Sequence, residues 1–198
     1  MNVLGCVLAA LLVSAHGGAL KINISPQDVD RALTIARARE ADRVQFHAPY
    51  IQKVDTAFIE RVETVSELRR VVLLAEGHIS RGDRWFAYSL ARATGALEVW
   101  RRRVSIIAHV RFHPQNNYVA APPVTIRMAG NDGALVGITR DPVTAVPSGR
   151  SGEFVPVLGV VVEGVFEGEA LGQRVRDFVI ELDGRELGRV TFDFSTIE

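Results

Sequence analysis

The apolar pattern of the chain changes its period near residue 104. Before that point, apolar residues recur every three or four positions, which is the spacing of a helix with one buried face. After it they alternate or form short branched runs between turn residues, which is typical of strands. Helices followed by strands predict an α+β fold rather than repeated βαβ units. We expect a helical region over 20–103 and an antiparallel β-sandwich domain, immunoglobulin-like or of a related type, over 104–198.

Three helix starts are expected in the first region. Ser25 precedes Pro26, and a serine cap followed by a proline at the first helical position opens a helix. Thr64 and Glu67 have capping-box spacing, which predicts a second helix. A third helix is expected after residue 83, with one continuous apolar stripe formed by Phe86, Leu90, Ala93, Leu97 and Trp100.

The second region contains six expected strands. They cover 104–112, 124–128, 135–139, 154–167, 174–182 and 187–194. A turn is expected at 131–133 and a loop over 142–152, where glycine, proline and small polar residues gather.

The last two strands allow a more specific prediction. Asp183-Gly184 is a strong two-residue hairpin signal. Unbroken pairing would set Phe178 opposite Arg189 and bury an arginine. One extra residue at or near Gly188 sets Phe178 opposite Val190 instead, so we predict a β-bulge there.

The first fifteen residues resemble a secretory leader. Val3 to Val13 is an almost unbroken apolar run, and Val13-Ser14-Ala15 offers the small residues that a signal peptidase accepts. The run is shorter than the ~20 residues of a membrane span. We therefore expect a signal peptide over 1–15, a secreted or periplasmic protein, and no membrane span after cleavage. Only the amino terminus and Asn2 precede the run, with no lysine or arginine, so the alternative is a buried N-terminal strand or helix of a cytosolic protein.

Composition excludes several classes of function. Cys6 is the only cysteine, and cleavage of the leader would remove it, which leaves no disulfide, thiolate metal site or cysteine nucleophile. The range 20–103 has 15 Lys or Arg against 11 Asp or Glu, whereas 104–198 has 8 against 12. Neither region shows the concentrated basic face of a nucleic-acid-binding protein, so we expect no nucleic-acid partner.

Sequence motifs for common chemistries are also missing. The chain has no phosphate-cradling glycine loop, no His-Glu-x-x-His zinc helix, no Gly-x-Ser-x-Gly elbow and no EF-hand loop. We therefore assign no catalytic residue, and expect no cofactor and no bound metal.

The most polar segment follows the first expected strand of the second region. Its candidate ligand-binding residues are His113, Gln115, Asn116, Asn117 and Tyr118, which would line a binding loop. The competing interpretation is a connecting loop whose Asn, Gln and Pro residues only make turns. If the strand reaches His113, this residue and His109 share a face but lie about 13 Å apart, too far to share a metal ion unaided.

A second candidate is the aromatic segment 46–50. His47 is the right type of residue for a general base or a metal ligand, and Tyr50 lies near it in the sequence. The competing interpretation is that the aromatic rings pack against the next element and the histidine bonds a carbonyl oxygen.

These features favour a non-enzymatic interaction or ligand-binding module outside the cytoplasm, with another protein or a small ligand as its partner. The alternative is a small secreted hydrolase or metal-dependent enzyme that uses His47, His109 or His113 with a nearby acid. Two of these histidines and a carboxylate around one cleft would favour the enzyme. A third hypothesis is that the first helices form a surface for self-association or for a partner.

Overall fold

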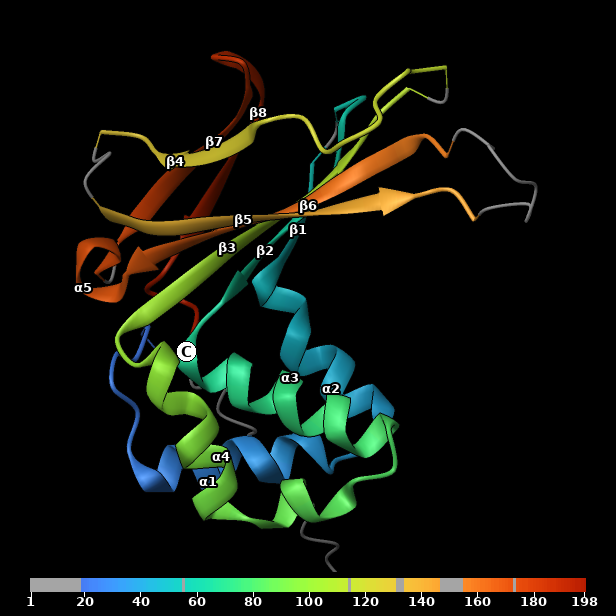
Figure 1. Ribbon diagram of the computed structural model, residues 1–198. Coiled ribbons are helices and arrows are strands. Elements are labelled where there is room, and N and C mark those ends of the chain that lie inside the picture. Colours follow the sequence, from blue (N-terminus) through green and yellow to red (C-terminus); the bar gives the residue numbers. More distant parts are fainter. Residues whose placement is uncertain (1–18, 55, 114, 131–133, 147–154, 173) are drawn as a thin grey trace, which may run out of the picture.

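The computed structural model describes residues 19–54, 56–113, 115–130, 134–146, 155–172 and 174–198. The chain is α+β, with helices in its N-terminal part and two antiparallel sheets of five and three strands. Figure 1 shows the helices of the N-terminal part gathered below the sheets. The α+β class expected from the sequence is therefore confirmed. The signal-peptide prediction falls on residues outside those that the structure describes.

All of the described helices except the last precede the strand Arg103–Arg111. The α-helices are α1 Pro26–Ala36, α2 Glu40–His47, α3 Glu67–Ser80, α4 Leu90–Leu97 and α5 Gly168–Leu171; the 3₁₀ helices are η1 Ala48–Tyr50, η2 Arg84–Tyr88 and η3 Glu98–Trp100. The first start is confirmed, since the Asp28 amide donates to the Ser25 hydroxyl at 3.2 Å. None of the helices in the described residues is long and apolar enough to cross a membrane.

The other two expected helices differ in detail from the structure: the second begins two residues later than expected, and the third begins after residue 83 as expected but is not continuous. Thr64 does not cap a helix but lies fully buried in a strand, and Ser66 caps α3 by accepting from the Arg69 amide. The expected third helix is divided into η2, α4 and η3. Ser89 accepts from the Arg92 amide and so begins a new helix inside the stripe.

The strands form two sheets. The five-stranded sheet has the order β1 Ile51–Lys53, β2 Ile59–Val65, β3 Arg103–Arg111, β6 Val157–Glu167 and β5 Leu135–Thr144; the three-stranded sheet has the order β4 Val124–Met128, β7 Val175–Leu182 and β8 Arg185–Asp193. Strands β1 and β2 come from the region 20–103, where we expected helices only. Because β2 pairs with β3, the first region contributes directly to the larger sheet.

Strand β5 is longer than expected. It runs on to Thr144, through the start of the expected loop, and Pro142 lies opposite Val160 of β6. A proline lacks an amide donor, but β5 is an edge strand, and no strand of the described residues pairs with its outer side. The turn expected at 131–133 and the rest of the loop, over 147–152, fall outside the described residues.

The C-terminal hairpin confirms the expected bulge. Phe178 lies opposite Val190 and Ile180 opposite Gly188, but Glu181 pairs with Glu186, so Leu187 is the extra residue. The turn residues Asp183 and Gly184 both have positive φ, at 51° and 75°. Such values are those of a type I′ turn, which an Asp-Gly pair favours.

The apolar core has two parts. One lies between the two sheets, where the Phe178 ring meets the Phe166 ring edge-on at 5.3 Å and the Phe194 ring at 6.2 Å. The other lies among α1, α3 and α4, and its largest buried members include Leu33 and Leu68. The two sheets therefore share one apolar core, and the helices form a separate core beside it.

Candidate functional site

The polar loop after β3 is held by its own hydrogen bonds. The Asn116 side-chain amide donates to the carbonyl oxygens of His113 at 2.8 Å and of Val157 at 3.1 Å. The backbone amide of Gln115 donates to His113 Nδ1 at 3.1 Å, and the backbone amide of Tyr118 donates to Asn116 Oδ1 at 2.8 Å. The turn-making role that competed with ligand binding is therefore present. Asn116 also fixes the loop against the start of β6.

The same loop forms one wall of a pocket, which we call the end pocket. Its volume is about 240 Å³, and it is lined by Phe58, Val110, Phe112, His113, Asn116, Tyr118, Leu182, Arg185 and Leu187. These residues come from the approach to β2, the end of β3 and the β7–β8 hairpin. Because β3 belongs to the larger sheet and the hairpin to the smaller one, the end pocket lies at one end of the interface between the sheets.

The end pocket has apolar walls and a few polar groups. Phe112 is buried and meets the Tyr118 ring edge-on at 5.1 Å, which gives the pocket an aromatic wall. Arg185 is exposed and makes no ion pair with any described residue. The Nδ1 atom of His113 already accepts from the loop, so its Nε2 is the ring nitrogen available to a ligand. An apolar pocket with a few convergent polar groups is typical of a binding site.

The structure brings together some of the candidate residues and separates others. His113, Asn116 and Tyr118 line the end pocket, whereas Gln115 and Asn117 are exposed parts of the same loop. His47 and Tyr50 do not line this pocket: His47 contacts Arg69 and Glu76 of α3, and the Tyr50 hydroxyl donates to the Glu198 carbonyl.

Four of the pocket residues that sequence reasoning missed come from other parts of the chain. They are Phe58, Leu182, Arg185 and Leu187. The hairpin prediction could have pointed to the last three, because it placed them around one turn. It gave no indication that this turn meets the loop after β3.

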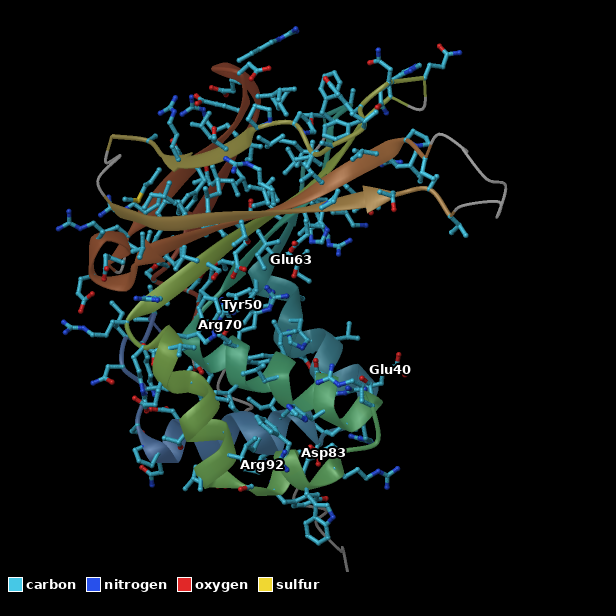
Figure 2. All side chains as sticks on the ribbon, in the orientation of Figure 1. Glu40, Tyr50, Glu63, Arg70, Asp83 and Arg92 are labelled. Atoms are coloured by element: carbon cyan, nitrogen blue, oxygen red, sulfur yellow. The ribbon has the colours of Figure 1, made fainter. Side chains whose placement is uncertain are left out.

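A second polar arrangement, the charged chain, joins the larger sheet to the helices through His109, Glu63, Arg69, His47 and Glu76. His109 Nε2 lies 3.1 Å from Glu63 Oε1, and Arg69 donates to Glu63 Oε2 at 2.7 Å. Arg69 Nε also donates to His47 Nδ1 at 3.3 Å, and His47 Nε2 lies 3.1 Å from Glu76 Oε2. Figure 2 shows Glu63 in the space between the sheet and the helices.

The contacts within the charged chain shift the pKa values of Glu63 and Arg69. Hydrogen bonds from His109, Arg61 and Arg69 hold the pKa of Glu63 well below its usual range. Burial lowers the pKa of Arg69, against the opposing effect of Glu63. Tyr50 lies close to Arg69 of the charged chain. Burial raises the pKa of Tyr50 to about 12, and its hydroxyl donates to the Glu198 carbonyl at 2.8 Å. The carboxylate of Glu63 therefore stays ionised far into acid.

The three histidines of the enzyme alternative do not converge on one cleft. His113 lines the end pocket, and Arg69 separates His47 from His109 in the charged chain. Each of the two carboxylates in that chain also contacts an arginine, which is typical of a structural ion-pair network. Among the described residues, no group of three or more His, Cys, Asp or Glu side chains is placed to hold a metal ion.

Comparison with protein-family models, with curated proteins and with solved structures found no match for this chain.

Proposed function

We propose that this protein is a non-enzymatic binding module that acts outside the cytoplasm. Its end pocket would receive an apolar group, with a negative charge beside it, from a small ligand or a partner protein. The observation that carries the proposal is the pocket itself, with three of the loop candidates on its wall. The loop that holds them is fixed by Asn116, so the pocket is formed before a ligand arrives. Preformed apolar pockets are the usual sites of ligand binding.

The pocket chemistry defines the class of ligand. Its walls include Phe112, Leu182 and Leu187, which favour an alkyl chain or a ring. Arg185 offers the rim a guanidinium without an ion-pair partner among the described residues, which favours a carboxylate or another anion beside the apolar group. A volume of about 240 Å³ is small for a binding pocket, which suits a short chain or a single anchoring side chain.

The location and the fold type are parts of the same proposal. Export is supported by the apolar run from Val3 to Val13 and the small residues after it. The β-sandwich type, immunoglobulin-like or related, is supported by the two antiparallel sheets and their shared core. Modules of this type often bind through loops at one end of the sheets, where the end pocket lies.

The test is a calorimetric titration of the full chain with octanoate and with octanol, which share an alkyl chain but differ in charge. We expect octanoate to bind about tenfold more tightly, the contribution of one charge-assisted interaction. Arg185→Gln should remove this preference. Arg174→Gln is the matched control, because Arg174 is exposed and precedes β7 at the far end of the hairpin. Equal effects of the two substitutions, or no binding of either compound, would overturn the proposal.

A further inference from the structure

A second pocket, which we call the arginine pocket, lies in the helical part of the molecule. Its volume is about 230 Å³, and its lining includes Arg37, Arg43, Arg84 and Tyr88 over an apolar floor of Ala36 and Ile79. The three arginines come from the end of α1, from α2 and from η2. Asp83, the residue before η2, marks the end of the helical part that is remote from the sheets (Figure 2). The fold therefore gathers three cations from separate elements.

These cations have little compensating negative charge. No acidic residue lines the pocket. Arg37 is held by neutral groups, the Ala87 carbonyl and the Thr34 hydroxyl, and Arg84 makes no ion pair with any described residue. Arg43 is the exception, because its Nη1 lies 3.4 Å from Glu76 Oε1.

The acid that contacts Arg43 is shared. Glu76 also lies 3.1 Å from His47, so it does not serve Arg43 alone. The buried Nε of Arg43 has no hydrogen-bond partner among the described residues. With Glu76 counted against Arg43, about two positive charges remain uncompensated. Like charges gathered in this way repel one another unless an anion lies between them.

We propose that the arginine pocket binds a phosphate group through Arg37, Arg43 and Arg84. A phosphate monoester carries a charge of about −1.5 to −2 at neutral pH, which matches the excess positive charge of the pocket. Guanidinium groups bind phosphate oxygens through paired hydrogen bonds. A single carboxylate would leave one of the cations without a partner. The site shares no residue with the end pocket, so it is independent of the binding function proposed above.

Exposed aromatic residues show how the rest of the ligand is accommodated. Tyr88 is 68% exposed, and the Arg37 guanidinium lies 4.6 Å from the centre of its ring, so one face of Tyr88 is already occupied. Trp85, in the same turn, is 79% exposed. These rings can stack on the organic part of a soluble phosphate ester or enter the interface of a lipid bilayer. The phosphate is the common chemistry, and the two sources are separated by experiment.

The first arm of the experiment measures binding of inorganic phosphate to the full chain by NMR, against chloride at equal ionic strength. The second arm measures sedimentation with phosphatidylcholine vesicles, with and without phosphatidic acid. Both arms compare Arg84→Gln with Arg81→Gln, since Arg81 is exposed, makes no ion pair with a described residue and does not line the pocket. Thermal unfolding checks that each variant folds.

We expect Arg84→Gln to weaken phosphate binding about tenfold, the loss of one charge-assisted contact, and Arg81→Gln to leave it unchanged. Selective loss in the first arm supports a soluble phosphate ligand. Selective loss in the vesicle arm alone supports a lipid headgroup. No binding in either arm, or equal loss in the two variants, overturns the proposal.

Discussion

Arg69 of α3 donates to Glu63 of β2 at 2.7 Å, and the arginine side chain is only 2% exposed. This contact joins the helical part of the molecule to the larger sheet. It belongs to the charged chain, which continues from Glu63 to His109 and from Arg69 to His47. A buried guanidinium is tolerated because each end of its fork has an acceptor, the Glu63 carboxylate and the Thr64 carbonyl at 2.6 Å.

Replacing Glu63 by glutamine should destabilise the fold. The substitution keeps the size of the side chain but leaves the buried Arg69 without a counter-charge, which should cost about 2 kcal/mol of unfolding free energy. Urea denaturation at neutral pH measures this change. Glu60→Gln on the same strand is the control, because the Glu60 side chain is 55% exposed, and it should change stability by less than about 0.5 kcal/mol. Similar losses in the two variants would refute the structural role of the Glu63 contact.

The contribution of Glu63 should also depend on pH. Its pKa is depressed in the folded state, so its stabilisation is fully present above the ordinary carboxyl pKa of about 4.3 and is lost as pH falls towards the folded value. The difference in stability between the wild type and Glu63→Gln should therefore be smaller at pH 3 than at pH 7. Paired denaturation curves at the two pH values give this difference directly. A difference that does not change with pH would contradict the account.

Replacing two glycines by alanine should change the stability of the protein in opposite directions. A Cβ at Gly159 would lie 2.4 Å from the Val110 carbonyl oxygen, a backbone atom of the neighbouring strand, so Gly159→Ala should destabilise the protein by about 2 kcal/mol or more. A Cβ at Gly95 would meet nothing within 4 Å, and this exposed position lies inside α4. Gly95→Ala should stabilise the fold by about 0.5–1 kcal/mol, because alanine loses less backbone entropy in a helix. Thermal unfolding of both variants checks the signs, and a shift in the same direction would be inconsistent with the backbone contacts described.

Local signals in the sequence predicted local structure well. The Ser25–Pro26 helix start, strand β4 and the bulge beside Gly188 all follow from patterns a few residues long. Strand β2 was missed because a register shift between Ile59 and Arg61 interrupts its alternation, and because Thr64 within the strand imitates a helix cap. Its place in the sheet depends on pairing with β3, which lies far away in the sequence.

The candidate site was predictable only in part. The loop at 113–118 stands out by its composition, and three of its residues line the end pocket. The rest of the pocket comes from the β7–β8 hairpin and from Phe58, and only the packing of the two sheets brings these segments to the loop. Arg69, which separates His47 from His109, gave no signal because a single arginine in an amphipathic helix is an ordinary surface residue.

The most direct test of the end pocket is an NMR titration of the full chain with octanoate. We expect chemical-shift changes confined to the amides around the pocket, with Phe58, Phe112 and Leu187 among the largest, and we expect these changes to disappear when Leu187→Trp fills the space. Leu158→Trp is the matched control, because Leu158 is 37% exposed and does not line the end pocket. Shifts scattered over the surface, or shifts that persist in Leu187→Trp, would contradict the claim that this pocket is the binding site.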